Sequence, residues 1–100
     1  MLIPLFLNKK SLVYELNELY TSWFNNIKKI ELKGYRKKGT DNFEEFILLT
    51  WDGGGYSTAS NNANSLTATA KNVARMLDGG VYENWEFYTN IMESEDWIEV

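Results

Sequence analysis

A short run of apolar residues, bounded on both sides by turn-forming residues, most constrains how this chain can fold. Residues 46–49 are all apolar, and turn-forming residues occupy 39–42 before them and 52–55 after them. Such a run predicts a central strand, over 43–51, that is covered on both faces, because a strand with one wet face alternates apolar and polar residues. The rest of the chain must therefore supply elements for both faces of one sheet.

The segments on either side of this strand predict its neighbours in the sheet. Ile30, Leu32 and Gly34 alternate with charged or polar residues, which indicates a strand with one wet face. Residues 56–60 predict a short third strand, because the glycines at 53–55 accept the positive φ angles of a tight hairpin. We therefore expect a three-stranded antiparallel meander.

Apolar residues recur at helical spacing in three further segments. Residues 11–27 predict an amphipathic helix before the sheet, which Ser11 can cap. Residues 66–77 predict a second helix, which the glycines at 79 and 80 can end. The segment that contains residues 85–92 fits either a strand or a helix, and its length favours a third helix.

Together these elements predict one α+β domain over residues 1–100, in the order helix, three strands and two helices (αβββαα), with helices on both faces of the sheet. Residues 1–10 are expected to form an N-terminal extension packed on the core. This apolar segment is too short to span a bilayer, and its lysines follow the apolar run instead of preceding it as in a signal peptide. Trp97 and Ile98 are expected to pin the C-terminal tail to the same body.

The chain contains neither histidine nor cysteine. This excludes Cys/His zinc sites, disulfides, thiol nucleophiles and Ser-His triads, and it favours a reducing, cytoplasmic setting. The glycines at 53–55 are not followed by Gly-Lys-Ser/Thr, so a nucleotide site is not expected. Paired acids such as Glu83 and Glu86 could act as acid and base only inside a cleft. We therefore expect a monomeric binding protein without catalytic residues, cofactor or metal.

Charge is distributed unevenly along the sequence. Residues 1–40 hold eight basic and three acidic side chains, a net charge of +5, whereas residues 76–100 hold seven acids and no base, a net charge of −7. The acidic third can lie on an ordinary solvated surface, or it can offer carboxylates where a partner binds phosphates. The basic stretch 28–38, in which Tyr35 is expected to share the exposed face of the lysines, can contact nucleic acid directly or simply keep a sheet edge from pairing with other chains.

Four segments resemble the small prophage anti-CRISPR proteins that inhibit Cas9 by occupying its PAM-reading site. They are Leu16-Asn17-Glu18-Leu19 for the family's first helix, Ile30-Glu31-Leu32-Lys33-Gly34 for its first strand, Asp52-Gly53-x-x-Tyr56 for its inserted hairpin, and Glu86-Phe87-Tyr88 followed by Met92 for its last helix. The chain departs from the family in its N-terminal segment 2–10 and in its basic first strand.

The resemblance implies a protein of a phage or mobile element that acts inside a bacterial host. Its acidic, DNA-mimicking surface would bind a Cas9–guide RNA complex and block recognition of target DNA, with no direct contact to nucleic acid or membrane. Cas9 reads PAM guanines with arginines, and carboxylates can accept the same hydrogen bonds. The partner-binding residues implied are Asp52, Gly53, Gly54, Tyr56, Glu83, Glu86 and Glu93.

Overall fold

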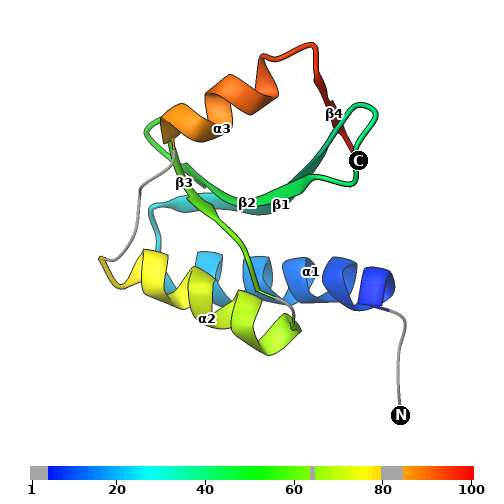
Figure 1. Ribbon diagram of the computed structural model, residues 1–100. Helices are drawn as coiled ribbons and strands as arrows, with labels where there is room; N and C mark the ends of the chain where they lie inside the picture. The colour runs from blue at the N-terminus through cyan, green and yellow to red at the C-terminus, as the bar shows by residue number, and fades with distance from the viewer. Residues whose placement is uncertain (1–4, 64, 80–84) are drawn as a thin grey trace.

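The computed structural model describes residues 5–63, 65–79 and 85–100, and within them it confirms the α+β class with three helices and a four-stranded antiparallel sheet (Figure 1). The elements in chain order are α1 (Leu5–Trp23), β1 (Ile27–Lys37), β2 (Phe43–Trp51), β3 (Tyr56–Ser60), α2 (Leu66–Leu77), α3 (Trp85–Met92) and β4 (Trp97–Glu99). The strand order across the sheet is β3-β2-β1-β4. Helices α1 and α2 lie on one face and α3 lies on the other (Figure 1).

Strand β2 is buried on both faces, as its apolar run predicts. Side chains that alternate along the strand enter two separate hydrophobic clusters, because successive residues of a strand point to opposite faces. Ile47 and Leu49 belong to the cluster under α1 and α2, and Phe46 and Leu48 belong to the cluster under α3. The first cluster comprises Leu16, Ile27, Ile30, Ile47, Leu49, Ala59, Val73 and Met76. The second comprises Tyr35, Phe46, Leu48, Tyr88 and Ile91.

The side chain of Asn17, on α1, takes the place of a neighbouring strand beside β1. Its Nδ2 donates a hydrogen bond to the Ile30 carbonyl oxygen at 3.0 Å, and its Oδ1 accepts one from the Ile30 amide at 2.8 Å. Strand β4 pairs only with residues 35–37 of β1, so it does not reach Ile30. Asn17 therefore satisfies both backbone groups of a residue that is fully buried.

A polar network centred on Asn61 joins β3 to β2 and α2. The buried Asn61 side chain donates through Nδ2 to Glu45 Oε1 at 2.7 Å and to Thr69 Oγ1 at 3.1 Å. Its Oδ1 accepts a hydrogen bond from Asn72 at 2.9 Å. Ser65 caps the helix that follows, because its hydroxyl accepts a hydrogen bond from the Ala68 amide. These bonds hold α2 against its face of the sheet.

Most predicted boundaries agree with the structure, but the predicted bounds of the first helix are wrong. The bounds of β2, β3 and α2 match the predicted ranges 43–51, 56–60 and 66–77, and the ambiguous last segment forms a helix, α3, as its length favours. Helix α1 begins at Leu5 and ends at Trp23, so residues 5–10 belong to this helix and Ser11 lies inside it rather than at its cap. Residues 5–10 include no glycine or proline that would stop a helix before Ser11. The helix ends early because Ile27 is the first residue of β1.

The predicted meander is present, and a fourth strand completes the sheet. Strand β4 pairs with β1 in antiparallel register, with Arg36 opposite Ile98. Trp97 packs against the cluster under α3, as expected for a residue that holds the tail, whereas the side chain of Ile98 is exposed. A strand of three residues is too short for its alternation to be recognised in a sequence, so the sequence pattern does not predict it.

We predict that Asn17→Ala lowers the free energy of unfolding by about 2 kcal/mol, because it leaves two buried backbone groups of Ile30 without partners. The measurement is urea denaturation followed by circular dichroism. The control is Asn90→Ala at an exposed position of α3, which should change stability by about 0.5 kcal/mol or less. Equal effects of the two substitutions would show that Asn17 does not support the edge of β1.

We also predict that Thr58→Val stabilises the protein by about 1 kcal/mol. Thr58 lies in β3 opposite Leu48, its side chain is buried, and its Oγ1 has no hydrogen-bond partner among the described residues. Valine has nearly the same shape and removes the unpaired hydroxyl. Thermal denaturation should show a higher midpoint for Thr58→Val and nearly no change for Thr67→Val on the exposed side of α2. A lower midpoint for Thr58→Val would contradict the prediction.

Candidate interaction surface

A stacked pair of aromatic rings joins the β2–β3 hairpin to the start of α3. The ring centroids of Tyr56 and Trp85 are 5.9 Å apart, with an angle of 10° between the ring planes. Each residue is the first of its element, so the pair brings the hairpin at 52–55 beside the N-terminal end of α3 (Figure 1). Tyr56 is 56% exposed and Trp85 is 44% exposed. The pair therefore presents aromatic surface to solvent at the junction of two elements.

The structure groups some of the predicted partner-binding residues around this pair. Asp52, Gly53 and Gly54 form the exposed hairpin tip, where Gly54 has a φ of +83° and the Asp52 amide donates to the Asn26 carbonyl oxygen at 2.9 Å. Glu86 is exposed in the first turn of α3, next to Trp85 in sequence. The hairpin tip, the aromatic pair and Glu86 therefore lie at one end of α3. We call this set the hairpin–α3 surface.

Two of the predicted residues do not join this set. Glu93 follows the C-terminal end of α3, seven residues beyond Glu86 and about 10 Å farther along a helix axis. Glu83 lies outside the described residues. The acidic residues of the last third of the sequence are therefore divided among several places.

Folding also cancels part of the charge separation along the sequence. Strand β4 brings Glu99 to 3.5 Å from the ammonium of Lys33, and Glu31 lies 3.8 Å from the same ammonium. Burial alone lowers the pKa of Lys33, but Glu99 and Glu31 together outweigh it, so the pKa is raised above the ordinary value. By contrast, Asp52 and Glu86 form no ion pair with another described residue. The hairpin–α3 surface therefore presents two carboxylates, Asp52 and Glu86, that a partner can bind.

Sequence reasoning missed Trp85 as a surface residue, because aromatic residues at helical spacing usually belong to a core. A signal was present: α3 has only eight residues, yet five of them are large and apolar, which is more than one buried face can hold. The structure buries Tyr88 and Ile91 and leaves Trp85, Phe87 and Met92 partly exposed. A pocket of about 310 Å³ lies beside them, lined by Glu31, Lys33, Leu48, Tyr56, Trp85, Tyr88 and Met92.

The basic stretch 28–38 does not present the aromatic ring that stacking on a nucleic-acid base requires. The expectation that Tyr35 shares the exposed face of the lysines is wrong, because Tyr35 is only 4% exposed. Its ring packs edge-on against Phe46 and Tyr88, with centroids 6.3 and 6.2 Å away. Burial, together with a hydrogen bond to Tyr88, raises the pKa of the Tyr35 hydroxyl well above its ordinary value. Helix α3 covers this part of the sheet, which the sequence pattern of β1 alone does not reveal.

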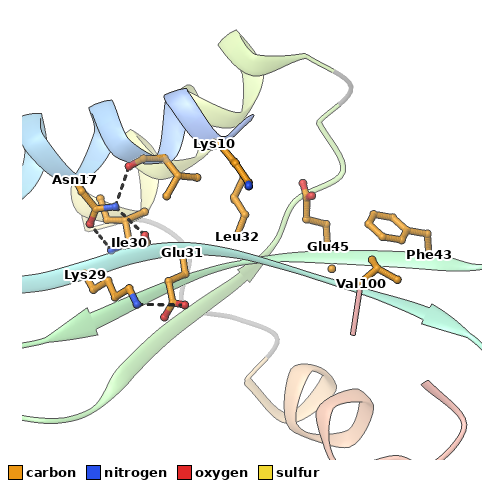
Figure 2. A pocket seen from close by; sticks show the side chains of 11 residues that line it. Lys10, Asn17, Lys29, Ile30, Glu31, Leu32, Phe43, Glu45 and Val100 are labelled. Carbon is orange, nitrogen blue, oxygen red and sulfur yellow. Dashed lines mark hydrogen bonds and ion pairs between the residues drawn. The ribbon is translucent and has the colours of Figure 1, made fainter. Parts of the chain in front are cut away.

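A second, larger pocket lies between α1 and β1 (Figure 2). Its volume is about 620 Å³. It is lined by Lys10, Val13, Asn17, Lys29, Ile30, Glu31, Leu32, Gly34, Phe43, Glu45 and Val100. None of the predicted partner-binding residues lines this pocket.

We predict that the Tyr56–Trp85 stack contributes measurable coupling between the hairpin and α3. A double-mutant cycle of Tyr56→Ala and Trp85→Ala, followed by urea denaturation, should give a coupling energy of about 1 kcal/mol. The control cycle combines Tyr56→Ala with Phe43→Ala at the other end of β2, and it should give a coupling energy near zero. Equal coupling in both cycles would show that the stack does not hold the two elements together.

No helix of the described residues is both long and apolar enough to cross a bilayer, and those residues contain no group of three or more acidic side chains that could hold a metal ion. No protein-family model, curated protein or solved structure matches this chain. The partner of the hairpin–α3 surface is therefore inferred from the residues of this chain.

Proposed function

We propose that this protein is a phage or mobile-element inhibitor that binds a Cas9–guide RNA complex in the cytoplasm of a bacterial host. It docks the hairpin–α3 surface on the basic groove that receives target DNA, and it acts as a stoichiometric binder without turnover. The observation that carries the proposal is the exposed Tyr56–Trp85 stack, which stands between the hairpin of Asp52 and the first turn of α3, where Glu86 lies.

The composition of this surface suits a protein interface with a basic partner. Exposed tryptophan and tyrosine side chains supply much of the binding energy at protein interfaces, because they bury large areas at a small entropic cost. Carboxylates beside such anchors accept charge-assisted hydrogen bonds from arginine and lysine. Asp52 and Glu86 are exposed and form no ion pair with another described residue, so docking breaks no such pair.

The assignment of Cas9 as the partner rests on the resemblance of the hairpin and last helix to anti-CRISPR proteins. The arginines that read PAM guanines are arranged to donate to acceptors on DNA, and a surface that presents carboxylates competes for the same donors. The exposed glycines at 53 and 54 let the hairpin backbone approach the groove closely. Direct binding of DNA by this anionic surface is disfavoured by charge repulsion.

The test measures binding of labelled target DNA to Cas9–guide RNA in the presence of this protein. We predict that the wild-type protein abolishes DNA binding at saturation, and that Asp52→Ala combined with Glu86→Ala raises the concentration for half-inhibition by about tenfold or more. The matched control is Glu15→Ala combined with Glu18→Ala on the exposed side of α1, which removes the same charge elsewhere and should leave inhibition unchanged.

Two outcomes would overturn the proposal. One is unchanged binding of target DNA at saturating inhibitor. The other is a gel shift in which this protein binds DNA or RNA directly and more weakly as salt rises, because that result favours the alternative function through the basic stretch 28–38. Equal loss of inhibition in the control pair would show that net charge, rather than the hairpin–α3 surface, determines binding.

A further inference from the structure

The outer edge of β1 has a gap in its hydrogen bonding at Leu32. In an antiparallel ladder, alternate residues turn their backbone groups toward and away from the neighbouring strand. Ile30 turns its groups away from β2, toward Asn17, so Leu32 and Gly34 turn theirs toward the same outer edge. The Gly34 carbonyl oxygen accepts from the Val100 amide at 2.9 Å. No described residue bonds to the backbone of Leu32 across this edge.

This gap opens into the pocket of about 620 Å³ between α1 and β1 (Figure 2). The pocket has apolar walls from Val13, Leu32, Phe43 and Val100. Phe43 is 46% exposed and Val100 is 64% exposed, so these walls are accessible from solvent. The pocket therefore combines an unpaired backbone donor and acceptor with room for an apolar side chain.

The charged side chain beside Leu32 in this pocket is a cation, Lys10. Glu31 is paired with Lys29 at 3.7 Å and with Lys33 at 3.8 Å, and the carboxylate of Glu45 accepts a hydrogen bond from Asn61. Lys10 is exposed and forms no ion pair with any described residue. Figure 2 shows its side chain reaching from α1 toward Leu32. An anionic group is therefore the complementary ligand at this position.

The space along the edge also limits the length of the ligand. Asn17 occupies the edge at Ile30 and Val100 occupies it at Gly34, so a passing strand is blocked in both directions. A chain end can pair with Leu32 alone. We propose that this pocket binds the C-terminal residue of an extended peptide from a partner protein, with an apolar side chain and a free carboxylate.

The pocket offers a contact to each part of such a residue: its amide, its carboxylate and its side chain. The peptide amide donates to the Leu32 carbonyl oxygen, and the terminal carboxylate accepts from the Leu32 amide and from the ammonium of Lys10. The apolar side chain enters the space between Val13, Phe43 and Val100. Pairing with a strand edge gives binding energy through the backbone, and the carboxylate contact selects a chain end over an internal segment.

The test titrates isotope-labelled protein with acetyl-Ala-Ala-Val that has a free carboxylate, and in parallel with the same peptide amidated at its C-terminus. The acid peptide should shift the Leu32 amide resonance and slow its hydrogen exchange, whereas the Ile30 amide, already bonded to Asn17, should change little. The amidated peptide should bind more weakly. Lys10→Gln should lower the affinity for the acid peptide by about threefold, as expected for the loss of one exposed ion pair. Lys28→Gln should leave that affinity unchanged.

Three kinds of result would contradict this site. Equal binding of the acid and amidated peptides would overturn the role of the carboxylate. Shifts confined to α3, or no shift at Leu32 at millimolar peptide, would overturn the site itself. Concentration-dependent changes at Leu32 without peptide would identify a second copy of this chain as the occupant and would overturn the peptide assignment. None of these results depends on Cas9 binding, so this proposal and the proposed function can fail separately.

Discussion

The fold depends on one strand that is buried from both sides. The side chains of β2 alternate between two clusters, with Ile47 and Leu49 under α1 and α2 and Phe46 and Leu48 under α3. Because this strand has no wet face, every helix that covers it must pack closely, and the loss of either cover would expose part of an apolar strand. Helix α3 covers Phe46 and Leu48, whose apolar side chains are more stable when buried. This packing sets the position of α3 and therefore the position of the Tyr56–Trp85 stack.

The interaction surface is a consequence of a helix that carries more apolar residues than it can bury. Tyr88 and Ile91 are buried in the cluster under α3, whereas Trp85 remains at the surface, where its ring stacks on Tyr56. The fold also brings β4 beside β1 and places Glu99 next to Lys33. Part of the charge separation in the sequence is thus cancelled within the fold, and carboxylates such as Glu86 remain available to a partner.

Strand β1 shows how an exposed sheet edge can be closed by different groups along its length. A side-chain amide from α1 pairs with Ile30, and strand β4 pairs with residues 35–37. The backbone groups of Leu32 lie between them without a hydrogen-bond partner on this edge among the described residues. Such a gap leaves a donor and an acceptor facing a pocket, where the end of another chain can pair with them.

The sequence alone determined the local elements, and only the tertiary structure decided which of their residues meet. The apolar run of β2 and the glycines of its hairpin act over a few neighbouring residues, so their signals could be interpreted without a fold. Contacts between distant segments leave no such local signal. The burial of Tyr35, the pairing of β4 with β1 and the meeting of Tyr56 with Trp85 all depend on where α3 packs. The candidate surface could therefore be predicted only in part. The sequence predicts its hairpin, whereas only the packing of α3 shows that Trp85 lies beside that hairpin.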